Sequence, residues 1–199
     1  MRILRLQLEH FRNYVAQTVE FSEHDIQLFV GKNGAGKTNI LEALSILSLT
    51  KSCRGNDETD LVLWDRTHYR IIATVRSDSG DDSRLEVVSE TAPRKRKALF
   101  LNDVRTNAAM FVGTLPTVTF LPQDLLLFSG PPAERRRFFD ELLSQVSAQY
   151  LEDLSQYQKI LQQRNALLKR IAAGHEQSQA LDVWDAELVP RATAVTLAR

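Results

Sequence analysis

The sequence predicts an α/β fold in two parts, the first rich in β-strands and the second made of helices. Three observations lead to this prediction. Polar and apolar residues alternate near the start, a glycine-rich loop joins an apolar segment to a helical one between residues 26 and 49, and helical periodicity takes over from Pro131. We expect the first lobe to span residues 1–122 and the second to span residues 123–199.

The composition is that of an ordinary soluble globular protein, with 43% hydrophobic and 25% charged residues in 199. Lys+Arg and Asp+Glu are balanced at 25 each, so only local patches can point to nucleic acid. Cys53 is the single cysteine, which excludes an internal disulfide and a cysteine-based zinc cluster and fits a reducing compartment. No window approaches the ~18 apolar residues of a membrane span, so we expect a cytoplasmic location and no membrane partner.

The first strand follows from Leu4, Leu6 and Leu8, which alternate with polar residues as in a half-buried strand. Residues 11–14 then turn the chain, and a second strand over residues 15–21 is expected to pair with the first. An antiparallel edge therefore precedes the glycine-rich loop.

The apolar residues 26–30 predict a strand that leads directly into the loop Gly31–Thr38, and the apolar spacing after the loop predicts a helix. The loop matches the phosphate-binding pattern G-x-x-x-x-G-K-[ST] at every fixed position. Its glycines allow a tight turn in which backbone N–H groups point inward, and the helix N-terminus adds a positive dipole end. The residues expected to bind the phosphates are Gly31, Asn33, Gly34, Ala35, Gly36, Lys37, Thr38 and Asn39.

Two side chains of this loop carry the expected chemistry. The Lys37 ammonium would reach the β- and γ-phosphate oxygens as a mobile charge, and the Thr38 hydroxyl would occupy one position on Mg²⁺. A glycine-rich turn without a ligand is the structural alternative. The strand before the loop and the helix after it are the context that the binding motif requires.

A polar stretch over residues 50–58 is expected to be a surface loop, and residues 61–65 after it admit two interpretations. Four apolar residues and Asp65 have the form of a Walker B strand, yet Arg66 stands where many ATPases carry a glutamate. Because this form is short and common, a structural segment is the favoured interpretation.

Several β elements follow without helices between them. Strands are predicted over residues 69–76, 84–90, 98–101 and 118–121, with a polar hairpin loop at 77–83 and a turn at 102–103. This arrangement argues against a simple alternating α/β sheet.

The second lobe is predicted to contain a helix that starts at Pro131–Pro132 and, after it, an antiparallel helical hairpin. The apolar face of the first helix consists of Phe138, Phe139, Leu142 and Leu143. A longer helix covers about residues 149–171 and a matching apolar stripe returns between residues 181 and 195. Because the connection between them is short, the two helices are expected to lie antiparallel.

Two basic runs are candidate phosphate-contacting surfaces. One consists of Arg94, Lys95, Arg96 and Lys97, and the other covers residues 135–137. Such runs bind nucleic acid with steep salt dependence and no sequence preference. A solvated hairpin loop is the alternative for the first run.

Several separated motifs, taken together, point to one family. They are Phe11–Tyr14, Gly31–Asn39 with Leu41–Ala43, Lys51–Arg54, Phe120–Leu125, Gly130–Pro132 followed by Arg135–Arg136 and Phe139–Asp140, and Tyr157–Lys159 with Gln163–Asn165. With these motifs the chain resembles, over essentially all of its length, the N-terminal part of the RecF family of bacterial recombination-mediator ATPases. That family is related to the heads of structural-maintenance-of-chromosomes (SMC) proteins and to ABC ATPases.

The resemblance implies an ABC-type P-loop ATPase head, with mixed and antiparallel sheets around the P-loop helix in lobe I and a helical lobe II, and with ATP and Mg²⁺ as cofactors. By position, Gln123 resembles a glutamine that contacts Mg²⁺ and the attacking water, and Arg12 resembles a residue that approaches the nucleotide. A surface loop glutamine and a solvated arginine are the alternatives. The family's signature and Walker B motifs lie downstream of the helical lobe. We therefore expect a truncated head, whose own ATP turnover is left open.

The resemblance further implies a DNA repair and recombination mediator that dimerises with ATP on DNA. Its expected ligands are duplex DNA and single-strand/double-strand junctions, and its expected partners are RecR and RecO. A complete small-molecule phosphotransferase with Asp65 as metal ligand is one alternative, against which the β-rich residues 69–104 argue. A structural chromosome-organising head is another, but the helical arm spans only about 35 Å at the helical rise.

Overall fold

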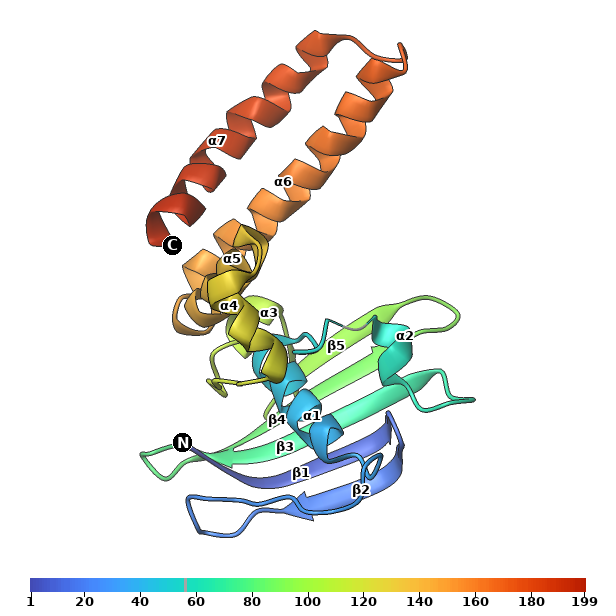
Figure 1. Ribbon diagram of the computed structural model, residues 1–199, viewed down its shortest axis with the longest axis vertical. Coiled ribbons are helices and arrows are strands. Elements are labelled where there is room, and N and C mark those ends of the chain that lie inside the picture. Colours follow the sequence, from blue (N-terminus) through green and yellow to red (C-terminus); the bar gives the residue numbers. More distant parts are fainter. Residues whose placement is uncertain (56) are drawn as a thin grey trace. The chain divides into compact units, whose positions relative to one another are not determined.

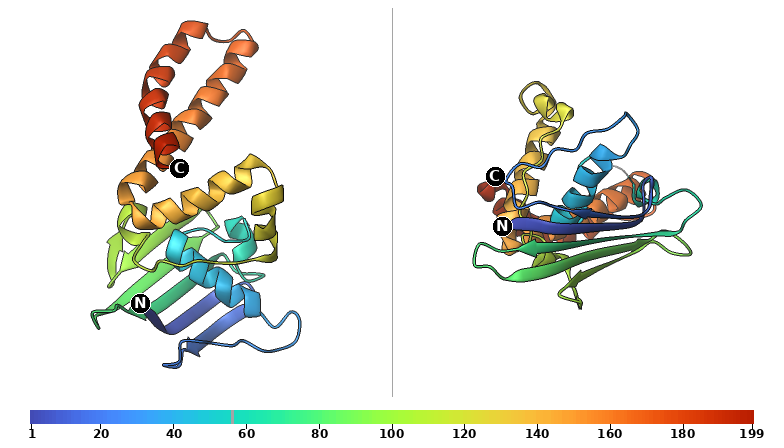
Figure 2. Two further views of the ribbon diagram at one scale, coloured as in Figure 1. Left: turned by 60° about the vertical axis from the view of Figure 1, so that its left-hand side comes forward. Right: turned by 90° about the horizontal axis from the view of Figure 1, so that it is seen from below.

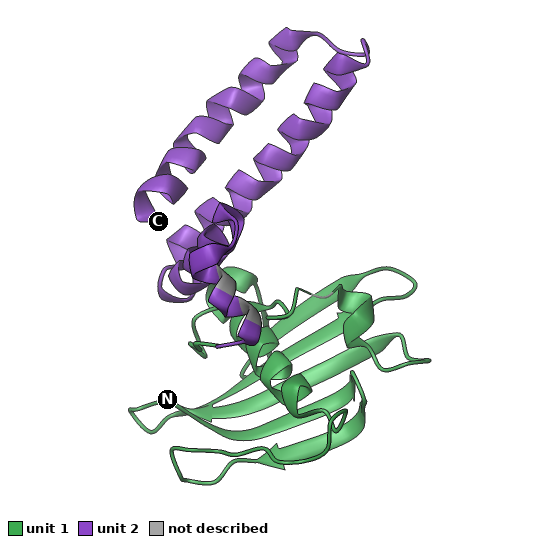
Figure 3. Ribbon diagram, viewed as in Figure 1, with its two compact units in different colours: residues 1–119 green, residues 120–199 purple. Residues whose placement is uncertain are grey.

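The computed structural model describes residues 1–55 and 57–199, and the side chains of Gln123 and Leu126 lie outside that description. The chain divides into two units, residues 1–119 and residues 120–199 (Figure 3). Each unit has its own secondary structure and its own buried cluster. The lobe boundary expected after residue 122 lies near this division and remains a proposal.

The first unit is built on one antiparallel sheet, as far as the described residues show (Figure 1). Its strands are β1 (Arg2–Phe11), β2 (Tyr14–Glu20), β3 (His68–Arg76), β4 (Asp82–Glu90), β5 (Arg96–Leu101) and β6 (Val104–Thr106). Their order in the sheet is β2-β1-β3-β4-β5-β6, and every neighbouring pair is antiparallel. The predicted pairing of the first two strands and the predicted hairpin around residues 77–83 are confirmed as β1–β2 and β3–β4. Strand β6 was not predicted from the sequence, because three residues are too few to show an alternating pattern.

One face of this sheet holds the core of the first unit. Leu6 and Leu8 in β1 and Ile71 in β3 are buried on that face, because alternate residues of a strand share a side. Helix α1 (Lys37–Leu49) packs against it with Ile46 and Leu47 fully buried, and Figure 2 shows the helix lying across the strands. Each such side chain contributes roughly 1.5–3 kcal/mol on burial. Because α1 begins directly after the glycine-rich loop and packs on the sheet, the C-terminal end of that loop is fixed to the core of the first unit.

Two predicted strands are not formed within the described chain. Residues 26–30 and 118–121 have no strand assignment, and the first segment exposes Ile26, Leu28 and Val30 at 85%, 83% and 83%. Only Phe29 packs against the core. A strand needs the backbone hydrogen bonds of a neighbour, and no described strand pairs with either segment. The apolar pattern of these segments therefore indicates β character but does not supply a partner strand.

The segment around Asp65 does not form a Walker B strand. Helix α2 (Glu58–Leu61) ends at the first residue of this segment, and Val62 makes an isolated β-bridge with Phe11. Asp65 itself adopts a left-handed backbone with φ 62°. The structural interpretation of residues 61–65 is confirmed, and α2 and α3 (Ala108–Phe111) are short helices that the sequence did not predict.

The second unit is helical, as predicted. It contains η1 (Pro122–Leu125), α4 (Leu126–Ser129), α5 (Pro132–Val146), α6 (Ala148–Ala172), η2 (Ser178–Ala180) and α7 (Leu181–Ala198). Helices α6 and α7 run antiparallel side by side (Figures 1 and 2). Val195 on α7 packs against Tyr150 and Leu154 on α6, and Arg164 pairs with Asp185 at 2.5 Å. The helical hairpin is therefore confirmed.

The apolar face predicted for α5 is only partly buried in this chain. Phe138, Phe139 and Leu142 remain 39%, 41% and 40% exposed, whereas Leu143 packs against the buried cluster of the unit. Near the same helix, Asp140 accepts a hydrogen bond from Tyr150 Oη and forms an ion pair with Arg199 at 2.8 Å. These polar contacts join α5, α6 and the end of α7.

Candidate nucleotide-binding site

Gly36 stands where the loop becomes α1, and its geometry requires glycine. Its backbone is left-handed, with φ 98° and ψ 3°. A Cβ atom added there would lie 2.6 Å from the Tyr14 hydroxyl oxygen and 2.8 Å from Asn13 Oδ1, closer than real carbon contacts allow. The side-chain ends of Tyr14 and Asn13 therefore lie directly against Gly36 and would have to shift to admit a Cβ atom.

Lys37 folds back over the loop that it follows. Its Nζ donates to the carbonyl oxygens of Gly31 at 2.8 Å and Lys32 at 2.9 Å. The first turn of α1 carries no acidic residue, so nothing in it opposes the positive end of the helix dipole. A phosphate oxyanion would form stronger, charge-assisted bonds with this ammonium than the neutral carbonyls do. The loop therefore has an available cation and a helix N-terminus at one place.

Asn39 and Asn13 connect the loop helix to the β1–β2 turn. Asn39 Nδ2 donates to Asn13 Oδ1 at 2.8 Å, and Asn13 Nδ2 approaches the carbonyl oxygen of Gly34 at 3.5 Å. Burial raises the pKa of the neighbouring Tyr14. The sequence predicted residues 11–14 only as a turn and a family motif, and it gave no sign that Asn13 and Tyr14 brace the loop.

Arg12 forms an ion pair with the buried carboxylate of Glu42. Its Nε and Nη2 donate to the two oxygens of Glu42 at 2.8 and 2.7 Å, and its Nη1 donates to the carbonyl oxygen of Asp60 at 2.6 Å. The Glu42 side chain is fully buried and also accepts from Ser52 Oγ at 2.5 Å. Arg12 is thus not the solvated arginine of the alternative interpretation. Its contact with a nucleotide stays a prediction, and in this conformation Glu42 holds its guanidinium.

The remaining predicted residues differ in what the structure shows of them. Asn33, Ala35 and Thr38 are exposed in the loop and first turn of α1. Gln123 belongs to η1, but its side chain lies outside the described part of the chain. Its predicted role toward Mg²⁺ and water therefore stays a prediction.

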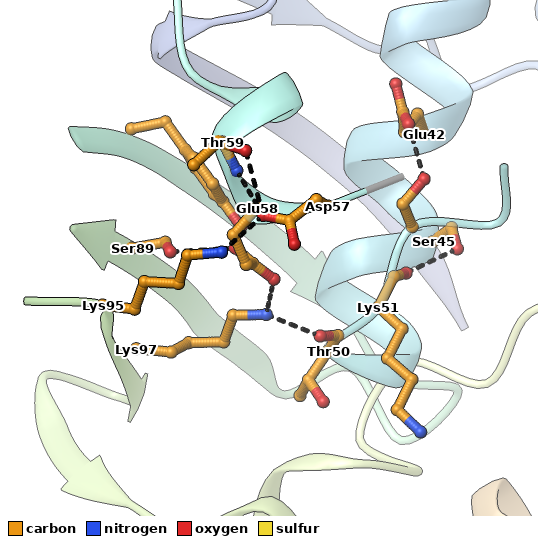
Figure 4. A network of polar contacts seen from close by, with 12 residues as sticks. Glu42, Ser45, Thr50, Lys51, Asp57, Glu58, Thr59, Ser89, Lys95 and Lys97 are labelled. Carbon is orange, nitrogen blue, oxygen red and sulfur yellow. Dashed lines mark hydrogen bonds and ion pairs between the residues drawn. The ribbon is translucent and has the colours of Figure 1, made fainter. Parts of the chain in front are cut away.

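In the basic run at residues 94–97, two of the four charges have acidic partners, and contact of the run with DNA stays a prediction. Lys97 pairs with Glu58 and donates to the carbonyl oxygen of Thr50 at 2.8 Å, and Lys95 pairs with Asp57 at 2.7 Å (Figure 4). The hydrogen bond from Lys95 lowers the pKa of Asp57 to about 2. Arg94 and Arg96 are exposed, so they are the members of the run best placed to meet phosphate.

Glu58 gathers further donors beside Lys97. Tyr69 Oη donates to its Oε2 at 2.7 Å, and Ser89 Oγ donates to the same atom at 2.8 Å. Burial raises the pKa of Glu58, but the bonds from Lys97, Tyr69 and Ser89 outweigh it and leave the pKa lowered. Burial together with the Glu58 charge raises the pKa of Tyr69. This network fixes α2 against the sheet.

Comparison with known proteins places this geometry in a family. The family model for the AAA ATPase domain matches residues 1–112, which include the sheet, the loop and α1. The chain belongs to this AAA ATPase family. Among the helices that the structure describes, none has the length and low polarity needed to cross a bilayer.

Relatives of this chain include proteins named "DNA replication and repair protein RecF". The one from Geobacillus sp. (strain WCH70) is 38% identical over 200 residues, which cover 100% of this chain and 52% of the relative. The one from Heliobacterium modesticaldum is 41% identical over 202 residues, again 100% of this chain and 52% of the relative. The predicted resemblance to the RecF family is confirmed, and the chain spans about half the length of the curated relatives it matches.

Solved structures agree with these relatives. The structure of the recombination mediator RecF with ATP matches with a TM-score of 0.88 at 29% identity, over 98% of this chain and 52% of that chain. An SMC ATPase structure matches with a TM-score of 0.58 at 21% identity, over 71% of this chain and 99% of that one, which shows a shared fold alone. The predicted ABC-type head fold is therefore confirmed.

Proposed function

We propose that this chain is the nucleotide-binding part of a RecF-like DNA repair and recombination mediator, and that it binds ATP with Mg²⁺. The observation that carries the proposal is the Lys37 ammonium held inside a glycine loop at the N-terminus of α1. The relatives named RecF and the solved structure of a RecF protein with ATP support the choice of nucleotide.

The donor set of the loop fits a magnesium-bound triphosphate. Backbone N–H groups at a helix N-terminus attract phosphate, and Lys37 adds a full positive charge. The Thr38 hydroxyl, in the first turn of α1, is of the oxygen type that Mg²⁺ prefers. Magnesium would supply charge neutralisation between phosphate oxygens. Gly31, Asn33, Gly34, Ala35, Gly36 and Asn39 complete the proposed cradle.

Turnover belongs, in this proposal, to a longer protein. There, two heads bind ATP between them, each loop facing the partner head's signature segment, and Gln123 orients the water. DNA, as duplex and as single-strand/double-strand junctions, is the proposed ligand of the dimer, and RecR and RecO are its proposed partners in the cytoplasm. The segments 26–30 and 118–121 support this proposal, since a longer chain could supply the neighbouring strands that they need.

The phosphotransferase alternative has less support. Asp65 lies in a left-handed turn after α2 and does not end a strand as a Walker B residue does. The strands β3 to β6 follow each other without the crossover helices that a parallel nucleotide-kinase sheet requires.

One experiment separates these functions. ATP turnover and particle mass are measured on the same sample of the chain with Mg²⁺ present, using phosphate release and light scattering. The proposal predicts nucleotide binding without steady turnover in a monomer. Steady turnover by a monomer, abolished by Asp65→Asn, would contradict the proposal and favour a complete phosphotransferase.

A further inference from the structure

Glu9, His10 and His68 form a cluster of potential metal ligands that is not part of the proposed nucleotide site. One ligand atom from each residue lies within 4.8 Å of the others, and both imidazoles are half-buried while Glu9 is exposed. His10 Nδ1 and His68 Nε2 are 3.3 Å apart, and the two rings meet edge to face with centroids at 4.9 Å. The cluster joins the end of β1 to the start of β3.

The backbone conformation of His10 explains how the side chains of the consecutive residues Glu9 and His10 both come near His68. The β1–β3 ladder ends at the pair Glu9 and Arg70, after which β1 bonds instead to the segment behind α2, with Leu63 N donating to the His10 carbonyl oxygen at 2.8 Å. His10 adopts φ 50° at this exchange. In a regular strand, consecutive side chains point to opposite faces. The left-handed residue breaks that alternation and brings Glu9 and His10 toward the same neighbour, His68.

The nitrogen separation matches a metal chelate. Two Zn–N bonds of about 2.0–2.1 Å that meet at the tetrahedral angle place their nitrogens about 3.3–3.4 Å apart, and the two imidazole nitrogens are 3.3 Å apart. A hydrogen bond between the rings has a similar length, so distance alone does not decide. The exposed carboxylate of Glu9 adds a negative charge and a third ligand, with an oxygen donor that zinc commonly takes.

We propose that Glu9, His10 and His68 bind a divalent transition-metal ion of the zinc type, with water as the fourth ligand. Arg70 lies near enough to Glu9 to interact electrostatically, but its Nε donates to Glu86 at 2.8 Å. Glu90 stands opposite His68 in the β3–β4 ladder and adds a second exposed carboxylate to the surroundings. The bound ion would tie β1 to β3 two positions before Arg12.

The first test is zinc binding by the chain, freed of metal and carrying no affinity tag, in competition with a chromophoric chelator. The sequence has four histidines, so the double variant His24→Gln/His175→Gln is a matched control that leaves the cluster intact. We expect one bound ion in the wild type and in this control. His68→Gln should bind at least about tenfold more weakly, since even outer-shell partners of a metal site are worth 10–100-fold.

The second test uses cobalt, whose visible absorption distinguishes tetrahedral from octahedral coordination. Tetrahedral bands in the wild type and the control, absent from His10→Gln and Glu9→Gln, would support the site even if His68→Gln fails to fold. Undiminished zinc affinity in His68→Gln, loss of binding in the control, or octahedral cobalt bands would each mean adventitious binding only, and would overturn the proposal.

Discussion

Gly36 combines two separate constraints in one residue. Its left-handed backbone alone disfavours a side chain, and a Cβ atom added there would lie 2.6 Å from the Tyr14 hydroxyl oxygen. Gly34 shares the first constraint with φ 82°, but a Cβ atom added there would meet nothing within 4 Å. The pair therefore allows backbone strain and collision to be measured separately.

Gly36→Ala should lose more stability than Gly34→Ala. A left-handed backbone costs a non-glycine residue roughly 1–2 kcal/mol, and this cost is common to both variants. The collision with the β1–β2 turn adds to it at Gly36 only. Urea unfolding of both variants measures the difference, and equal losses would contradict this prediction and show that the Tyr14 and Asn13 side chains move aside at no measurable cost.

Arg12 and Glu42 form a buried pair whose loss should be costly. Removing one partner of a buried ion pair costs about 3–5 kcal/mol, because the other charge is left uncompensated. We expect Arg12→Ala to fall in this range, since the Glu42 side chain is fully buried. The exposed Arg66 provides a control in Arg66→Ala, which should change stability little. Arg54 Nη1 also lies 3.9 Å from Glu42 Oε2. A small loss for Arg12→Ala in denaturant unfolding would therefore mean that Ser52 and Arg54 suffice to hold Glu42.

At the scale of elements, the network around Glu58 makes stability depend on pH. Its pKa is lowered in the folded chain by Lys97, Tyr69 and Ser89 acting against burial. A carboxyl with a lowered folded pKa contributes stability that is present above its unfolded pKa of about 4.3. That contribution is lost as pH falls through the folded value.

Glu58→Gln should therefore flatten the acid limb of the stability curve. In the wild type we expect the free energy of unfolding to fall as pH drops below about 5, and less steeply in the variant. Glu187→Gln, on an exposed part of α7, is the control and should leave the slope unchanged. Equal slopes for wild type and Glu58→Gln would contradict the network's contribution to the pH dependence.

The elements also show what a sequence can reveal. Strand alternation predicted β1 to β5, and Pro131 with the later apolar spacing predicted α5, α6 and α7. Residues 26–30 failed as a strand because ladder partners are a property of the whole sheet and not of the segment. The contacts of Arg12, Lys95 and Lys97 also escaped prediction, because their carboxylate partners are distant in sequence.

At the scale of the whole molecule, the basic run tests the proposed link to DNA. Arg94 and Arg96 are exposed, whereas Lys95 and Lys97 are paired with carboxylates. Each phosphate contact contributes about 0.9 to the slope of log affinity against log salt for duplex DNA. Arg94→Ala/Arg96→Ala should therefore lower this slope more than Lys95→Ala/Lys97→Ala does, as filter binding over a salt series would measure. Equal or unchanged slopes would remove the run from the DNA surface.

The central claim is that the loop around Lys37 binds the phosphates of Mg-ATP, and calorimetric titration tests it most directly. A hydrogen bond to a charged group is worth about 1.5–3 kcal/mol, so Lys37→Ala should weaken binding by about tenfold or more. Lys32→Ala removes an exposed charge from the same loop and should leave the affinity nearly unchanged. Tight Mg-ATP binding by a folded Lys37→Ala chain would contradict the assignment of this loop as the nucleotide site.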